Sequence, residues 1–120
     1  MAPQVLIIDD QEAIRSFLTA TLAAQGYAVR GAASAGAGLA AVREQRPDLV
    51  LLDLRLPDRS GLDLLADLRQ ECGELPVVVL TSYGRTEAVV EAMRLQALGF
   101  VTKPVNLDPL LTVLRRGIAR

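Results

Sequence analysis

The chain has 120 residues, 51% of them hydrophobic, and a formal net charge of −1 at pH 7. This length has room for one core, so we expect residues 1–120 to form one domain. The near-neutral charge argues against a partner recognised by charge alone, such as duplex DNA, and the apolar content argues against disorder. The sequence contains no His, so general-base or metal-binding chemistry must use other side chains.

Short apolar runs bounded by turn residues recur along the chain, which is typical of strands buried on both faces of a parallel sheet. In chain order these runs cover residues 5–8, 27–30, 49–53, 77–80 and 99–102. The second run, Tyr27–Arg30, is the weakest, so we expect it towards the edge of the sheet.

Apolar residues at helical spacing lie between these runs. The predicted helices begin near residues 12, 34, 60, 86 and 106. Ser34, Ser60 and Asn106 can cap three of them, and Phe17 falls with Leu18 on the predicted apolar face of the first helix. Five strands alternating with five helices through short loops predict a parallel α/β sandwich with helices on both faces.

The single cysteine, Cys72, forms no intramolecular disulfide, and we expect a small buried or half-buried thiol in a helix. The first four residues lack the basic and apolar segments of a signal peptide, and no apolar run approaches membrane-spanning length. These features predict a cytoplasmic protein that does not itself bind membranes or nucleic acid.

Polar residues follow the ends of four predicted strands. The buried run Leu49–Leu52 ends in Asp53, and the other strand ends carry Asp9-Asp10, Thr81 and Lys103. Because parallel strands end on one edge of a sheet, these side chains should converge there. Two unit charges about 4 Å apart repel by roughly 4 kcal/mol at an effective dielectric constant of about 20, so clustered carboxylates take up protons or bind a cation. Carboxylate oxygens favour Mg²⁺. A helix cap or Asx turn is the ordinary alternative for Asp53, and a solvated acidic rim is the alternative for the cluster.

Four short motifs share one order and spacing with a known family. They are Asp9-Asp10, then Asp53 with Leu56-Pro57-Asp58 and Ser60-Gly61, then Thr81-Ser82, and finally Lys103-Pro104 with Phe100 three residues earlier. The chain therefore resembles the receiver domain of two-component response regulators, from its first strand to its last helix. The resemblance implies a flavodoxin-like sheet of order 2-1-3-4-5, with the site between the first and third strands.

The resemblance also implies the roles of the site residues. Asp53 would be the phosphoacceptor, taking a phosphoryl group from a sensor histidine kinase or a small phosphodonor in a Mg²⁺-dependent reaction. Asp9, Asp10, Asp53 and the backbone carbonyl of Arg55 would hold the Mg²⁺. Lys103 would pair with Asp53 and then with the phosphoryl group. Such a protein is a switch that phosphorylates and dephosphorylates itself, and it is not a turnover enzyme.

The switching step would use further residues. By the same resemblance, Thr81 would donate a hydrogen bond to the phosphoryl group, and Phe100 would be the aromatic switch residue. An ordinary core aromatic is the alternative for Phe100. The surface of the fourth helix, fifth strand and fifth helix would change, and it could serve an output domain, a downstream protein or a homodimer. Arg55 and Tyr83 fall at positions that tune dephosphorylation in the family.

This chain departs from the family pattern at two positions. Gln11 stands where a third acidic residue is common, and Gln96 stands where glycine usually precedes the last strand. The sequence therefore does not predict the conformation of the turn around Gln96. A degenerate receiver that only binds a partner protein remains the alternative function, although the acid pair, Asp53, Thr81 and Lys103 are all present.

Two other function classes fit less well. An enzyme that turns over phosphometabolites through an aspartyl phosphate usually needs a second acid two residues after the nucleophile, where this chain has Arg55. Residues 36–41 fit a G-x-G-x-x-A dinucleotide fingerprint, but they do not follow directly from a strand. A flavodoxin would need a phosphate-binding loop after the first strand, where Asp9-Asp10 would repel the phosphate.

Overall fold

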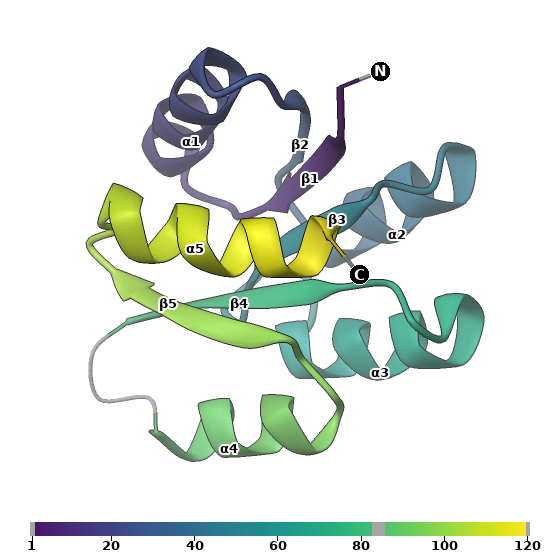
Figure 1. Ribbon diagram of the computed structural model, residues 1–120. Coiled ribbons are helices and arrows are strands. Elements are labelled where there is room, and N and C mark those ends of the chain that lie inside the picture. Colours follow the sequence, from purple (N-terminus) through teal and green to yellow (C-terminus); the bar gives the residue numbers. More distant parts are fainter. Residues whose placement is uncertain (1, 83–85, 120) are drawn as a thin grey trace.

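The structure, a computed structural model, describes residues 2–82 and 86–119. The strands are β1 (Gln4–Ile8), β2 (Ala28–Ala32), β3 (Leu49–Asp53), β4 (Val77–Ser82) and β5 (Gly99–Lys103). The helices are α1 (Glu12–Ala24), α2 (Ala35–Glu44), α3 (Gly61–Cys72), α4 (Thr86–Arg94) and α5 (Leu107–Ile118) (Figure 1). All ten predicted elements are present, in the predicted order.

The five strands form one parallel sheet of order β2-β1-β3-β4-β5, which confirms the predicted fold class. The central strand β3 is buried along its whole length, as its unbroken apolar run predicts. Strand β2 lies at the edge, also as predicted, but it begins and ends later than the run at 27–30. The reason is its register, which pairs Ala28 with Gln4 and Ala32 with Ile8 of β1.

The core consists of two apolar layers, one on each face of the sheet. Successive residues of a strand point to opposite faces, so each inner strand supplies both layers. On one face Val5 and Ile7 of β1 belong to a cluster that includes residues of α1 and α5, and on the other Leu6 and Ile8 belong to a cluster that includes residues of α2, α3 and α4. This double burial explains why the strands read as continuous apolar runs.

Two of the three predicted caps are confirmed. The Ser34 hydroxyl accepts a hydrogen bond from the Ala37 amide at 3.1 Å, and the Ser60 hydroxyl accepts one from the Leu62 amide at 3.1 Å. Asn106 occupies the N-cap position of α5, but its side chain makes no capping hydrogen bond, so that prediction is only half right.

The prediction that Phe17 faces the core is wrong. Leu18 and Leu22 of α1 are fully buried, whereas Phe17 is 53% exposed. On a helix these two leucines, four residues apart, define the buried stripe, and Phe17 lies at its margin and faces solvent. Cys72 is a half-buried free thiol, as expected. Within the described part of the chain, no helix is long and apolar enough to cross a membrane.

Gln96, at the position where the family pattern has glycine, adopts a positive φ of 64°. This is the left-handed region that glycine enters most easily. The chain therefore keeps the backbone turn before β5 with a residue that is less suited to it.

Candidate functional site

Three carboxylates meet at the carboxyl edge of the sheet. Oxygens of Asp9, Asp10 and Asp53 lie within 4.8 Å of one another. Asp9 follows β1 and Asp53 ends β3, and these strands are hydrogen-bonded neighbours, so the topology brings the two acids together. Asp9 and Asp53 are buried while Asp10 is exposed. The cluster is therefore an acidic pocket with one side open to solvent.

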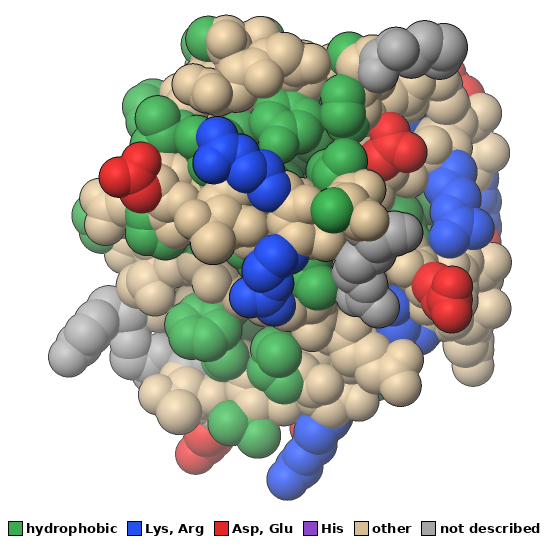
Figure 2. All heavy atoms as spheres, viewed as in Figure 1, with side chains coloured by type: hydrophobic (Ala, Val, Ile, Leu, Met, Phe, Trp, Pro, Cys, Tyr) green, Lys and Arg blue, Asp and Glu red, His purple; other side chains and the backbone are tan. Residues whose placement is uncertain are grey.

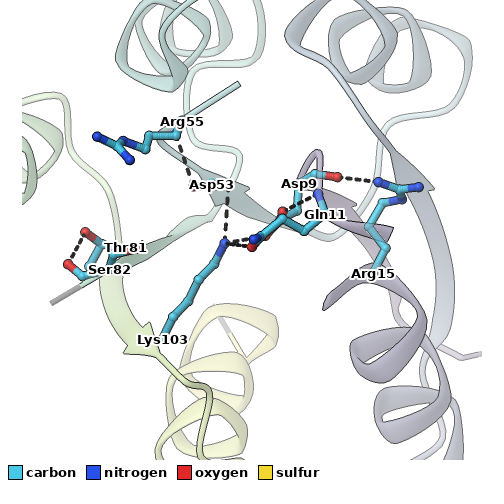
Figure 3. A network of polar contacts seen from close by, with 8 residues as sticks. All are labelled: Asp9, Gln11, Arg15, Asp53, Arg55, Thr81, Ser82 and Lys103. Carbon is cyan, nitrogen blue, oxygen red and sulfur yellow. Dashed lines mark hydrogen bonds and ion pairs between the residues drawn. The ribbon is translucent and has the colours of Figure 1, made fainter. Parts of the chain in front are cut away.

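The ammonium group of Lys103, at the end of β5, lies between two of these acids (Figure 3). Its Nζ is 2.8 Å from Asp9 Oδ2 and 3.3 Å from Asp53 Oδ2, and the side chain is only 13% exposed. One ammonium group therefore forms ion pairs with both buried acids.

Burial and neighbouring charges shift two pKa values here. Burial, reinforced by the nearby Asp9 charge, raises the pKa of Asp53, although the Arg55 amide and Lys103 act in the opposite direction. Burial alone would lower the pKa of Lys103, but Asp9 and Asp53 together outweigh it, and the pKa is raised. Lys103 is therefore charged at neutral pH, and the site favours additional positive charge.

The donor set fits a hard divalent cation. Among the described side chains that meet here, three carboxylates face one ammonium group, so positive charge is in deficit. The possible ligand atoms of this cluster are all carboxylate oxygens. Oxygen ligands with one side open to water suit Mg²⁺, whereas Zn²⁺ prefers His and Cys ligands.

Thr81 lies on the neighbouring strand but outside this cluster (Figure 3). The sheet register pairs Asp53 with Leu80, one residue earlier on β4. The Thr81 hydroxyl is buried and donates to the backbone carbonyl of Ser82 at 3.3 Å. It therefore lies at the predicted edge but is turned towards its own backbone, and a change of side-chain rotamer would release it.

Comparison with known proteins identifies the family to which this chain belongs. The family described as response regulator receiver domain matches residues 5–115. The chain belongs to this family. The resemblance found in the sequence motifs is thereby confirmed, and the acidic pocket is of the kind that receivers carry.

Individual relatives agree with this assignment. The receiver is 33% identical over 115 residues to the regulatory protein AtoC of Escherichia coli, covering 96% of this chain and 25% of AtoC. It is 41% identical over 118 residues to the transcriptional regulatory protein KdpE of Mycobacterium tuberculosis, covering 97% of this chain and 51% of KdpE. The crystal structure of the receiver domain of NtrX from Brucella abortus matches with a TM-score of 0.92 at 35% identity, covering 96% of this chain and 98% of that one. The chain spans a quarter to about half the length of these two curated relatives, which extend well beyond the receiver.

Phe100 is not a core residue of this receiver. Its side chain is 51% exposed, while the next residue of β5, Val101, is buried. The alternative that it is an ordinary core aromatic is therefore wrong. Figure 2 shows further apolar side chains on this face, over β5 and α4, where Val90 and Met93 are also more than 40% exposed, at 46% and 43%.

Arg55 contacts Asp53 through its backbone. The Arg55 amide donates to Asp53 Oδ1 at 3.1 Å, and the Arg55 side chain is exposed. This is the Asx-type contact expected as the ordinary alternative for Asp53. It coexists with the Lys103 contact, because the two use different carboxylate oxygens. Tyr83, the other predicted tuning position, lies outside the described residues.

Two residues make contacts at the site that were not predicted from the sequence. Gln11 donates its backbone amide to Asp9 Oδ1 at 2.9 Å and accepts a hydrogen bond from Lys103 Nζ at 3.2 Å. Arg15 Nη1 donates to the backbone carbonyl of Asp9 at 2.7 Å. The sequence pattern marked Gln11 only as a missing acid, and nothing in it marks Arg15, because its acceptor is a backbone atom.

The raised pKa of Asp53 leads to a prediction about stability. An acid with a raised pKa destabilises the fold when ionised, and this destabilisation is relieved as the pH falls through the raised pKa. In the metal-free protein at neutral pH, Asp53→Asn is therefore expected to increase the free energy of unfolding by about 1 kcal/mol, as measured by urea titration. Glu74→Gln, which removes an exposed charge elsewhere, serves as the control. A decrease for Asp53→Asn would mean that the Lys103 contact outweighs burial and repulsion.

Proposed function

We propose that this receiver is the phosphoacceptor switch of a two-component signal transduction system. Asp53 takes a phosphoryl group from a sensor histidine kinase or a small phosphodonor. Residues 1–120 act as one receiver unit in the cytoplasm. The observation that carries the proposal is the Lys103 ammonium group held 2.8 Å and 3.3 Å from two carboxylates of an acidic triad.

The transfer step follows from the groups around Asp53. A carboxylate oxygen of Asp53 attacks phosphorus, and the bond from phosphorus to the donor breaks. From phosphohistidine that bond is P–N, and the electron pair leaves with the imidazole, which is neutral when its other nitrogen carries the proton. The product is an aspartyl acyl phosphate. Lys103 then moves its ion pair from the carboxylate to the phosphoryl oxygens, where positioned positive charge stabilises phosphoryl transfer.

Mg²⁺ would be held by Asp9, Asp10, Asp53 and the backbone carbonyl of Arg55. When bound, it would neutralise charge on the phosphoryl oxygens. Hydrolysis by water later returns inorganic phosphate and the free carboxylate. Arg55 and Tyr83, each two residues beyond a site residue, are proposed to tune access of that water.

Switching needs more free energy than any one contact supplies. Moving a two-state equilibrium from 1:99 to 99:1 takes about 5.5 kcal/mol. A charge-assisted hydrogen bond from Thr81 contributes roughly 1.5–3 kcal/mol. Burying the exposed half of Phe100 adds about 1 kcal/mol, and new Lys103 contacts supply the remainder. We propose that phosphorylation turns Thr81 inward, that Phe100 fills the space released, and that the surface of α4, β5 and α5 changes for an output domain, a downstream protein or a homodimer.

Mass spectrometry of the intact protein tests the central step. After incubation with acetyl phosphate and Mg²⁺, the wild type is expected to gain the mass of one phosphoryl group. Asp53→Asn and a sample with Mg²⁺ removed by chelator are expected to gain nothing. An adduct that persists in Asp53→Asn would remove Asp53 as the phosphoacceptor.

The same measurement separates the alternative function. A degenerate receiver that acts only as a protein-interaction module would show no adduct with the wild type under any of these conditions. Its partner binding would then be independent of the phosphodonor. Steady release of phosphate from a phosphomonoester, in contrast, would indicate a turnover enzyme.

Replacing Phe100 tests the switching step. Phe100→Ala is expected to leave the yield of the phosphoryl adduct unchanged, because β4 lies between β5, which carries the ring, and β3, which carries Asp53. It is expected to abolish most of the change that phosphorylation causes in amide hydrogen exchange across α4 and β5. Phe17→Ala is a matched control, since Phe17 is the other phenylalanine and is equally exposed, at 53%. An unchanged exchange response in Phe100→Ala would exclude this role.

A further inference from the structure

Asp58 makes an unusual contact for a residue at the tip of a loop. Its Oδ1 accepts a hydrogen bond from the Ala35 amide at 2.9 Å, and its Oδ2 accepts one from the Gly36 amide at 2.8 Å. Both amides belong to the first turn of α2, more than twenty residues away in the chain. The carboxylate is exposed, yet both of its oxygens are engaged.

Helix α2 lacks a negative charge of its own at this end. Its first turn contains no acidic residue, and the hydroxyl of its own cap, Ser34, accepts its hydrogen bond from the Ala37 amide. The first amides of a helix have no partner within the helix, and they favour a negative charge. Asp58 supplies both the acceptor and the charge from another element. The same two hydrogen bonds lower the pKa of Asp58, so it is ionised at neutral pH.

The loop that carries Asp58 begins at the acidic site. Arg55 and Ser60 form an antiparallel bridge, and the Gly61 amide donates to the Leu54 carbonyl at 3.0 Å. These contacts close the loop of residues 54–61 at its base, directly after Asp53. At the tip, Pro57, Asp58 and Arg59 are exposed. Leu54 is buried in the core and Leu56 partly buried against it, and Arg59 forms an ion pair with Asp67 of α3 at 2.8 Å. The Asp58 carboxylate is the contact that ties the tip to α2 among those described.

We propose that Asp58 is a positioning residue for the phosphoacceptor site. By tying loop 54–61 to the first turn of α2, it fixes the backbone of Arg55 beside Asp53. The inference rests on the proposed function, in which the Arg55 carbonyl is a Mg²⁺ ligand. In this inference, a carboxylate outside the acidic triad restricts the motion of the loop. Asp58 touches none of the reacting atoms, and it acts only through the loop.

A plain helix cap would have a different signature, and Ser34 provides the matched control. Ser34→Ala weakens the same end of α2 but leaves the loop tethered. Asp58→Ala weakens that end and also releases the loop. Both variants are expected to lower the melting temperature. Only Asp58→Ala is expected to lower Mg²⁺ affinity, by about tenfold, the lower end of what groups behind a metal ligand contribute.

The experiment combines calorimetric titration of Mg²⁺ with hydrogen exchange of the Arg55 and Gly61 amides in the metal-free protein. Asp58→Ala is expected to speed exchange at both amides, whereas Ser34→Ala leaves both as in the wild type. Asp58→Asn, which keeps one acceptor oxygen, is expected to fall between Asp58→Ala and the wild type. It also keeps the test usable if Asp58→Ala does not fold.

Equal effects of Asp58→Ala and Ser34→Ala on affinity and exchange would overturn the inference and leave Asp58 as a cap. So would unchanged exchange at Arg55 and Gly61 in both Asp58 variants. Failure of the proposed function is separate, because it would appear as a wild type that takes up no phosphoryl group. The exchange measurement does not depend on that reaction.

Discussion

Gly61→Ala is expected to lower the free energy of unfolding by about 3 kcal/mol, at the upper end of what overpacking costs. A Cβ at this position would lie 2.5 Å from the Asp53 carbonyl oxygen and 2.6 Å from Leu54 Cα. Both are backbone atoms, which cannot rotate away as a side chain can. The start of α3 would therefore have to move away from the end of β3, and Asp53 would move with it. Urea unfolding at neutral pH measures the loss.

The control for this variant lies at the other end of the same helix. Gly73, after α3, has a positive φ of 47°, and a Cβ added there would meet no atom within 4 Å. Gly73→Ala is expected to cost about 1 kcal/mol for backbone conformation alone. It should leave Mg²⁺-dependent stabilisation intact, whereas Gly61→Ala should reduce it. Equal losses for the two variants would mean that the close contact at Gly61 relaxes without disturbing the site.

Lys103→Met is expected to slow phosphorylation of Asp53 by acetyl phosphate by about 100-fold, the usual effect of removing one preorganised charge-stabilising group. The Met side chain has a similar length but no charge. Without the ammonium group, Asp9 and Asp53 lose the ion-pair partner that they share, and the phosphoryl oxygens lose theirs. Rates are measured by intact-mass spectrometry at saturating Mg²⁺, so that weaker metal binding does not account for the change.

Arg94→Met is the matched control for net charge. The Arg94 side chain is 75% exposed, and among the described residues it forms an ion pair with Glu91 on its own helix, at 3.6 Å. It removes the same charge far from the acidic pocket, and its phosphorylation rate should equal that of the wild type. A Lys103→Met rate within a factor of a few of the wild-type rate would remove Lys103 from the transfer step.

The elements of the fold were predictable because burial on both faces leaves an unmistakable pattern. Leu49–Leu52 and Val77–Leu80 are apolar at every position, as a strand between two helical layers must be. The order of the strands came from the family resemblance and not from the pattern. Phe17 was placed wrongly because helical periodicity locates the buried stripe of a helix without fixing its edges. A large apolar residue at the edge of that stripe is then predicted to be buried.

The acidic site was predictable in part for a topological reason. Parallel strands bring their carboxyl ends to one edge, so Asp9, Asp53 and Lys103 could be placed together from sequence alone. The contacts of Asp58 and Gln11 could not be foreseen in the same way. Each depends on the path of a loop and on a backbone amide or side chain whose position is set only by the folded chain. Single polar residues in loops carry no periodic signal that would reveal such partners.

The shallow packing of α4 has a consequence for the conformational change proposed for this receiver. Ala92 is the only residue of this helix that is fully enclosed, and alanine contributes little contact area, whereas α5 encloses five residues. Displacing α4 from the sheet therefore requires less free energy than displacing α5. In the proposed switch, phosphorylation of Asp53 has to supply about 5.5 kcal/mol, and α4 is the helix that such an input would displace more readily than α5.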